Sequence, residues 1–124
     1  MKKYCILLIC LTIFGLFWIY FTVPKINTED AIDAIVGEAA NQSYDTMVCV
    51  AQGIRHRGTL HGVYGLHAKH NSSESDDTYE AAEQAWDDSA HVKDMIRGAK
   101  NWGTVTELPS LGVVRAKCGD LYFY

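Results

Sequence analysis

Apolar residues recur at helical spacing soon after the first two dozen residues of the chain. They are Ile32, Ile35, Val36 and Ala39, which fall on one stripe of a helix with 3.6 residues per turn. Thr28 precedes them as a candidate N-cap, and the acidic Glu29 and Asp30 follow in the first turn, where the helix dipole favours them. The pattern predicts a helix from Thr28 up to the polar turn Asn41-Gln42-Ser43.

A second pattern of the same kind predicts a helix from about Tyr44 to His56. Its inward positions are Met47, Val48, Ala51 and Ile54. Gly58 is expected to end this helix, because glycine adopts the left-handed conformation common after a last turn. Residues 58–78 contain three glycines and the polar run HNSSESDD, so this stretch is predicted to be a loop.

The last third of the chain changes from a helical to an alternating pattern. Asp77 or Thr78 is expected to cap a third helix through YEAAEQAWDDSAHVKDMIRGA, and a break near residues 89–92 is compatible with the pattern. Residues 101–112 have no regular period, whereas VVRAKCGDLYFY alternates like a terminal hairpin around Gly119-Asp120. These elements predict an α+β fold that is mostly helical and has a C-terminal β-hairpin.

The N-terminal segment has a different character. Residues 4–23 form an uncharged run of 20 residues behind Lys2 and Lys3. A helix of that length spans roughly 30 Å at about 1.5 Å per residue, the thickness of the hydrocarbon layer of a bilayer. The run ends without an Ala-x-Ala pattern, which favours an uncleaved anchor over a removed signal peptide. We therefore expect an anchor with a short linker over residues 1–27 and one domain over residues 28–124.

The charge of the chain bears on its location and its partners. The two N-terminal lysines favour an N-terminus inside the cell, with the domain in the periplasm or otherwise outside the cytoplasmic membrane. Residues 28–124 contain eight Lys and Arg residues against 15 Asp and Glu residues, a formal charge of −7. Such a domain lacks the basic surface of a nucleic-acid-binding protein.

Two cysteines lie in the expected domain. Outside the cytoplasm a disulfide between Cys49 and Cys118 is chemically allowed. Cys49 also lies within an apolar helical pattern, so a buried free thiol is an equally good interpretation. The sequence leaves both alternatives open.

Glu38 stands apart from the other acidic residues of the first predicted helix. On a helical wheel it falls about 60° outside the edge of the apolar stripe, at the C-terminal end of the helix. The negative end of the helix dipole is an unfavourable place for a carboxylate that has only a solvating role. Glu38 is therefore a candidate general acid at the border of the core, although glutamates at such borders are more often simply solvated.

Short motifs follow one another along the domain in an order that resembles a known family. They are Gly37-Glu38-Ala39, Val50-Ala51 with His56-Arg57, Gly62-Val63-Tyr64, Gly98-Ala99 with Trp102, and Gly119-Asp120 with Phe123. The ordered set covers nearly all of the domain and is similar to the cell wall hydrolase family of the spore cortex-lytic enzyme type. The chain differs from the family pattern at His56, where relatives carry Asn, and at Leu121, where His is common.

The resemblance implies a small lysozyme- or transglycosylase-like domain that degrades the glycan strands of peptidoglycan. By match, Glu38 is its catalytic acid. One carboxylate suffices for a lytic transglycosylase, whereas glycoside hydrolysis normally requires two. Asp45 is a weaker candidate for a second carboxylate, because an acid in the first turn of a helix already has a structural explanation.

Aromatic side chains supply candidates for sugar binding, because their rings can stack on sugar faces. The candidates are Tyr64, Trp102 and Tyr122, each otherwise explained as a core residue, together with His56 from the second predicted helix. No metal site is predicted, since His67 and His70 lack a convincing third ligand, and no cofactor is expected. The alternative function is a membrane-anchored domain that binds glycan or a partner without cutting it.

Overall fold

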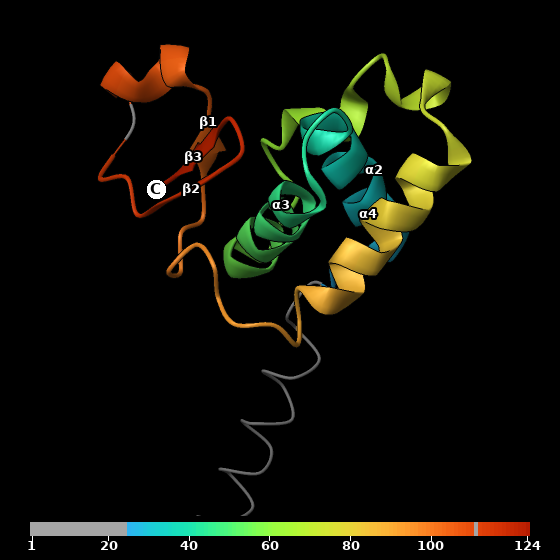
Figure 1. Cartoon of the computed structure of the whole chain (residues 1–124), viewed down its shortest axis with the longest axis horizontal. Helices are drawn as coiled ribbons and strands as arrows, with labels where there is room; N and C mark the ends of the chain where they lie inside the picture. Colours follow the sequence, from blue (N-terminus) through green and yellow to red (C-terminus); the bar gives the residue numbers. More distant parts are fainter. Residues whose placement is uncertain (1–24, 111) are drawn as a thin grey trace, which may run out of the picture.

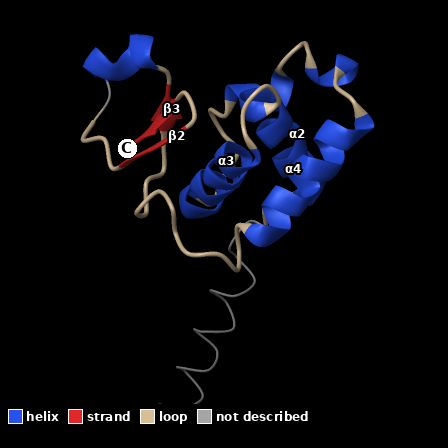
Figure 2. Cartoon of the chain, viewed as in Figure 1, coloured by secondary structure: helices blue, strands red, loops and turns tan. Residues whose placement is uncertain are grey.

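The computed structural model describes residues 25–110 and 112–124 (Figure 1). The apolar run at residues 4–23, and with it the predicted anchor, lies outside the described residues. Within the described ranges, no helix combines the length and the apolar character that crossing a membrane requires. Three α-helices lie together on one side, and a small β-sheet lies beside them (Figure 2).

Helix α2 spans Thr28–Ala39 and confirms the first predicted helix. Its N-cap is Asn27 rather than Thr28, because the side-chain oxygen of Asn27 accepts hydrogen bonds from the N–H groups of Glu29 and Asp30. The apolar stripe is buried at Ala31, Ala34, Ile35, Val36 and Ala39.

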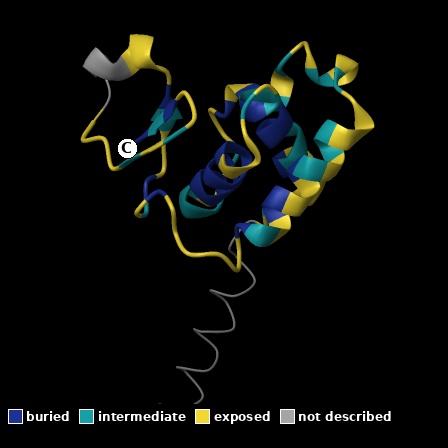
Figure 3. Ribbon diagram, in the orientation of Figure 1, coloured by how far each residue is buried: buried dark blue, intermediate teal, exposed yellow. Residues whose placement is uncertain are grey.

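Helix α3 spans Tyr44–Arg57 and confirms the second predicted helix. Ser43 caps its N-terminus, and Gly58 ends it with φ 72°, as the sequence predicts. All four predicted inward positions are buried, together with their neighbours Cys49, Val50 and Gly53. This helix is central because it contacts both other helices and the sheet. Much of its ribbon is accordingly coloured as buried in Figure 3.

The loop after α3 contains two short 3-10 helices, η1 at Tyr64–His67 and η2 at Asn71–Ser73. Helix α4 then spans Asp76–Asp88 with Ser75 as its N-cap. The third helix does not continue to about residue 99. It ends at Asp88 with Ser89 as its C-cap, at the break near residues 89–92 that the sequence pattern allows. The hydroxyl of Ser89 and the guanidinium of Arg55 both donate to the carbonyl oxygen of Trp86, each at 2.6 Å, and so satisfy a terminal backbone group of the helix.

Three short strands form an antiparallel sheet in the order β1-β3-β2. Strands β2 (Ala116–Cys118) and β3 (Leu121–Phe123) form the predicted terminal hairpin around Gly119-Asp120. Strand β1 (Trp102–Gly103) was predicted as irregular chain, since two residues are too few to show a period. It pairs with the other edge of β3, and Trp102 lies opposite Phe123. The mostly helical α+β class is thus confirmed, with a sheet of three strands where a hairpin was expected.

The sheet is attached to the helices by an apolar core and by one covalent bond. Phe123 is the largest of the fully buried side chains among the described residues. Cys49 of α3 and Cys118 of β2, which are 69 positions apart, form a disulfide. Of the two alternatives that the sequence leaves open, the structure therefore contains the disulfide and not a free thiol at Cys49. The side chain of Gln42 adds two hydrogen bonds with Asp120: its oxygen accepts from the backbone N–H of Asp120, and its amide nitrogen donates to the Asp120 carboxylate. Helices and sheet therefore form one body.

Candidate active site

Glu38 is half-buried near the C-terminal end of α2, and both of its carboxylate oxygens accept hydrogen bonds. The backbone N–H of Gly65 donates to Oε1 at 2.7 Å. The indole Nε1 of Trp102 donates to Oε2 at 2.9 Å. The two donors come from η1 and β1, which are distant in the sequence, so the carboxylate is fixed in position and in orientation.

The Gly65 donor reaches Glu38 because two glycines let η1 lie against α2. A Cβ atom added to Gly37 would overlap the carbonyl group of Gly65, and one added to Gly65 would lie 2.5 Å from Cγ of Glu38. Asn71 then fixes the loop, since its side-chain amide donates to the carbonyl oxygens of Gly65 and Asp33 at 3.0 and 3.1 Å. The close approach leaves room only for hydrogen at both glycine positions.

The second donor, Trp102, is held by contacts with α3 and the sheet. A Cβ atom at Gly53 would lie 2.8 Å from Cζ3 of the indole, so the ring fills the space above this glycine. The ring of Phe123 lies 6.0 Å away in a tilted arrangement, and the guanidinium of Arg57 lies 5.8 Å from the indole centroid. Arg57 is itself fixed by hydrogen bonds to the carbonyl oxygen of His61 and the side-chain oxygen of Asn101.

A cavity of about 350 Å³ opens onto Glu38. Its lining comes from α2, α3, the loop before η1, the sheet and the segment after β1. Among the residues that line it are Glu38, Arg57, Tyr64, Asn101, Trp102 and Glu107. Charged and hydrogen-bonding groups from distant parts of the chain thus converge on one space, which is the arrangement expected of a ligand site.

A second hollow of about 440 Å³ adjoins the first and shares Gly62, Val63 and Tyr64 with it. Leu60 and Leu66 add apolar surface, and His61 and His67 add polar groups. Tyr64 is 88% exposed, so its ring is available at the boundary between the two spaces. Together the two hollows can accommodate a ligand longer than either one alone.

The comparisons with known proteins identify the fold. No family model and no curated protein matches the sequence. The structure resembles the catalytic domain of the SleB protein of Bacillus cereus with a TM-score of 0.56 and 18% sequence identity, over 82% of this chain and 94% of that one. The fold is that of the SleB catalytic domain. The likeness to the spore cortex-lytic type that the motifs predict is therefore confirmed at the level of fold.

The SleB-like fold brings together three of the residues that the sequence proposed for the site. Glu38, Tyr64 and Trp102 all line the cavity. Tyr122 does not line it, because Leu121 and Phe123 face the core and the side chain between them points to the other face of the strand. Its ring lies 5.2 Å from the ammonium group of Lys117 instead.

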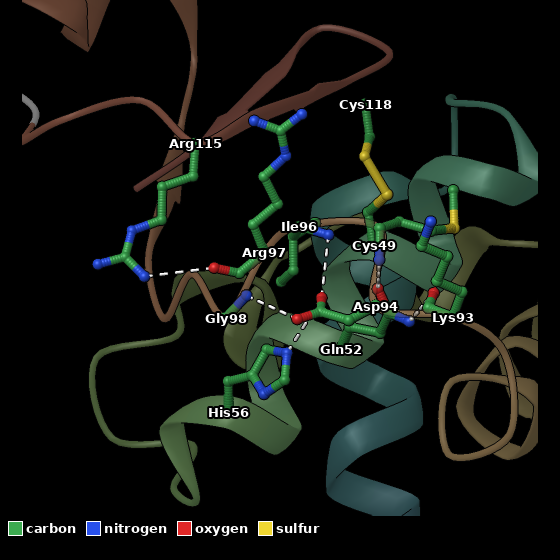
Figure 4. A network of polar contacts seen from close by, with 11 residues as sticks. Cys49, Gln52, His56, Lys93, Asp94, Ile96, Arg97, Gly98, Arg115 and Cys118 are labelled. Carbon is green, nitrogen blue, oxygen red and sulfur yellow. Dashed lines mark hydrogen bonds and ion pairs between the residues drawn. A yellow bond between two sulfur atoms is a disulfide. The ribbon is translucent and has the colours of Figure 1, made fainter.

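His56 also lies away from the cavity, on the side of α3 that faces the connection from α4 to β1 (Figure 4). Its Nε2 lies 3.3 Å from Oδ1 of Asp94, an ionic contact when the imidazole is protonated, although the geometry falls outside that of a regular hydrogen bond. The structure thus gives His56 a carboxylate neighbour, and substrate contact at this position stays a prediction.

Asp94 organises the turn that leads toward Trp102 (Figure 4). Its carboxylate accepts hydrogen bonds from the N–H groups of Ile96 and Gly98 at 3.0 and 2.7 Å. Burial acts to raise the pKa of Asp94, but the contact with His56 and these two N–H groups outweigh it and hold the pKa below its ordinary value. Gln52 supports the same turn by accepting from the N–H of Met95 and donating to the carbonyl oxygen of Lys93.

The sequence did not single out Glu107, a second carboxylate that lines the cavity. Its Oε2 accepts hydrogen bonds from the N–H and the hydroxyl of Thr104 at 2.6 and 3.1 Å. It lies in η3 (Val105–Ser110), a stretch without hydrophobic periodicity, so the sequence pattern does not predict which way its side chain points. Asp45, which the sequence analysis weighed as a second acid, is exposed in the first turn of α3 and is not among the cavity residues.

Proposed function

We propose that this protein cleaves peptidoglycan at the β-1,4 bond between N-acetylmuramic acid and N-acetylglucosamine, with Glu38 as general acid and base. The observation that carries the proposal is the Glu38 carboxylate itself, fixed by two donors and facing a polar cavity. The SleB-like fold and the Gly37-Glu38-Ala39 motif support it, because the family that the sequence resembles uses the glutamate of this motif as its acid.

The contacts of Glu38 are compatible with delivery of a proton. A protonated carboxyl oxygen keeps a lone pair, so it can still accept its N–H bond while its own O–H points at a substrate oxygen. Glu38 would donate this proton to the glycosidic oxygen as the bond from that oxygen to C1 of the muramic sugar breaks. In a lytic transglycosylase the resulting carboxylate then takes the proton of the muramic 6-hydroxyl, whose oxygen bonds to C1 and closes a 1,6-anhydro ring.

Hydrolysis is the second candidate, and Glu107 is the observation that favours it. Glycoside hydrolases that act through water or a covalent intermediate need a second carboxylate on the opposite side of the scissile bond. Glu107 lines the same cavity as Glu38 but comes from a different element. With water in place of the 6-hydroxyl, the product would carry a reducing end instead of an anhydro ring.

Digestion of purified peptidoglycan by the full-length protein, with mass analysis of the soluble fragments, tests the proposal. Fragments that carry 1,6-anhydro-muramic ends would establish the transglycosylase. Fragments with reducing ends, each about 18 Da heavier, would establish the hydrolase, because hydrolysis adds one water to the product. Binding to peptidoglycan with no fragment released would establish the alternative, a domain that binds glycan without cutting it.

We also propose that residues 4–23 anchor the protein in the cytoplasmic membrane with the domain outside. The basis is the uncharged run of 20 residues behind Lys2 and Lys3. Alkaline phosphatase fused after Tyr124 should be active, because that reporter needs export to fold. Activity of a cytoplasmic reporter at the same position would contradict the topology, and a mature chain that lacks the first residues would contradict the anchor.

A further inference from the structure

Trp102 contacts Glu38 through the polar edge of its indole and not through a ring face. The Nε1–H bond to Oε2 of Glu38 joins residues 64 positions apart. Stacking on a sugar uses the face of an aromatic ring, whereas this contact uses the one hydrogen-bond donor that the indole has. Stacking on a sugar and donating a hydrogen bond to Glu38 are therefore distinct roles for Trp102, and an experiment can separate them.

The opposite edge of the same indole packs against α3 at Gly53. The atoms that approach Gly53 are Cζ3 and Cε3, which lie across the ring system from Nε1. A Cβ atom at position 53 would lie 2.8 and 2.9 Å from them, so any larger residue would push the indole toward the cavity. The recess at Gly53 therefore sets how far Nε1 reaches toward Glu38.

The remaining contacts limit tilting of the ring. Phe123 is fully buried and lies 6.0 Å from the indole at an interplanar angle of 36°. Trp102 and Phe123 are also paired in the sheet, so their backbones are fixed relative to each other. One edge of the indole lies on Gly53, and the ring of Phe123 from the sheet lies beside it. The fold therefore determines the direction of the Nε1–H bond.

We propose that Trp102 is a positioning residue that orients the Glu38 carboxyl for catalysis. The inference rests on the proposed function of Glu38. A glutamate side chain held only at Oε1 by Gly65 can turn about that contact, whereas a second donor at Oε2 fixes the carboxyl plane. Such preorganisation matters because a displacement of about 1 Å at a reacting group can cost about 100-fold in rate.

Steady-state kinetics separate positioning from sugar stacking. We would measure cleavage of soluble strands of alternating N-acetylglucosamine and N-acetylmuramic acid by the full-length protein and by Trp102→Phe, which keeps an aromatic ring but removes the donor. Positioning predicts that kcat falls by about 10- to 100-fold while KM changes little. A raised KM with unchanged kcat would overturn the inference and leave stacking as the role of Trp102. The matched control is Trp86→Phe, because Trp86 lies under Arg55 of α3 and not at the cavity, and its kcat should equal that of the parent.

A spectroscopic readout tests the contact without relying on activity. The chain has three tryptophans, and the indole N–H resonance that disappears in Trp102→Phe is that of Trp102. Glu38→Gln should shift this resonance and leave that of Trp86 in place, because the substitution changes the acceptor of only one indole. A Trp102 resonance that is insensitive to Glu38→Gln would overturn the inference.

A second variant, Gly53→Ala, keeps the indole of Trp102 but displaces it, because the added methyl group would contact the ring. This variant tests the inference even if Trp102→Phe does not fold. It should lower kcat and shift the Trp102 resonance together, and a Gly53→Ala protein with parental kcat would overturn the inference. If the parent protein itself releases no fragments, the proposed function fails and the inference about catalysis falls with it. A cleaving parent with an equally active Trp102→Phe variant contradicts the inference alone.

Discussion

Gly37 of α2 lies directly against the carbonyl group of Gly65 in η1, with no space between them for a side chain. This contact joins two segments that also meet through the hydrogen bond from the Gly65 N–H to Glu38. A glycine in the last turn of α2 is therefore required for the close approach that places a donor on the candidate catalytic acid. A glycine inside a helix costs about 1 kcal/mol relative to alanine, so Gly37 is unfavourable for the helix itself.

Gly37→Ala should destabilise the fold and impair the site together. Its methyl group overlaps the Gly65 carbonyl, and overpacking of this kind costs about 1–3 kcal/mol. Denaturant unfolding measures the loss of stability, and peptidoglycan cleavage measures the effect on Glu38. Gly112→Ala is the matched control, because among the described residues its added Cβ would meet only Tyr124 at 3.6 Å, an ordinary contact distance. A Gly37→Ala protein as stable and active as the control would contradict the close approach.

Glu38→Gln should abolish cleavage while the protein stays folded. Glutamine is nearly isosteric and its side-chain oxygen can still accept one of the two N–H bonds, but it has no proton to deliver. Loss of general acid catalysis lowers the rate by about 10²- to 10⁴-fold, and more if the same group also serves as base. Glu80→Gln on the exposed face of α4 is the control and should cleave like the parent. Near-parental cleavage by Glu38→Gln would show that Glu38 is structural.

Tyr64→Ala should weaken binding to glycan strands without affecting stability. The side chain is 88% exposed and lines both hollows, so its removal leaves no hole in the core. Loss of one stacking contact should cost about 1 kcal/mol, which corresponds to an affinity roughly fivefold lower. Tyr122→Ala is the informative comparison, since Tyr122 lies beside Lys117 and outside the cavity. Equal losses for the two variants would mean that the glycan does not follow the hollows at Tyr64.

Removing the disulfide should loosen the sheet from the helices. The bond joins α3 to the hairpin across 69 positions, and loss of a native disulfide from a small domain typically costs about 2–5 kcal/mol. The expected result is a lower unfolding midpoint for the Cys49→Ser, Cys118→Ser double variant, and the same midpoint for the reduced parent. A reductant should have no further effect on the double variant. Identical midpoints for oxidised and reduced parent would contradict a stabilising bond.

The fold should lose stability at strongly alkaline pH through Tyr44. Burial and the 2.6 Å hydrogen bond that its hydroxyl donates to Asp88 raise the pKa of Tyr44 from 10.0 to about 12. A group whose pKa is higher in the folded than in the unfolded state makes its full contribution to stability at pH values below the unfolded-state pKa. This contribution is lost as the pH rises toward the folded-state pKa. The loss should therefore appear between pH 10 and about 12 in denaturant unfolding. Tyr44→Phe has no ionisable group at this position, so a decline of the same size in that variant would contradict the assignment.

Elements that depend on local order along the chain can be predicted from the amino-acid sequence. The spans of α2 and α3, the glycine end of α3 and the turn at Gly119-Asp120 follow from periodicity and capping among residues a few positions apart. The position of Glu38 at the border of the core follows from the same periodicity, because a regular helix fixes the direction of each side chain.

The hydrogen-bond donors that contact the Glu38 carboxylate are visible only in the folded protein. The donors on Glu38 are 27 and 64 positions away, and neither Gly65 nor the edge of Trp102 carries a local signal for this contact. The end of α4 depends likewise on Arg55 of another helix, and the place of Glu107 depends on a segment without periodicity. Periodicity reports which face of an element is buried, whereas a site is built from the packing of elements distant in sequence, and that packing is fixed only when the whole core forms.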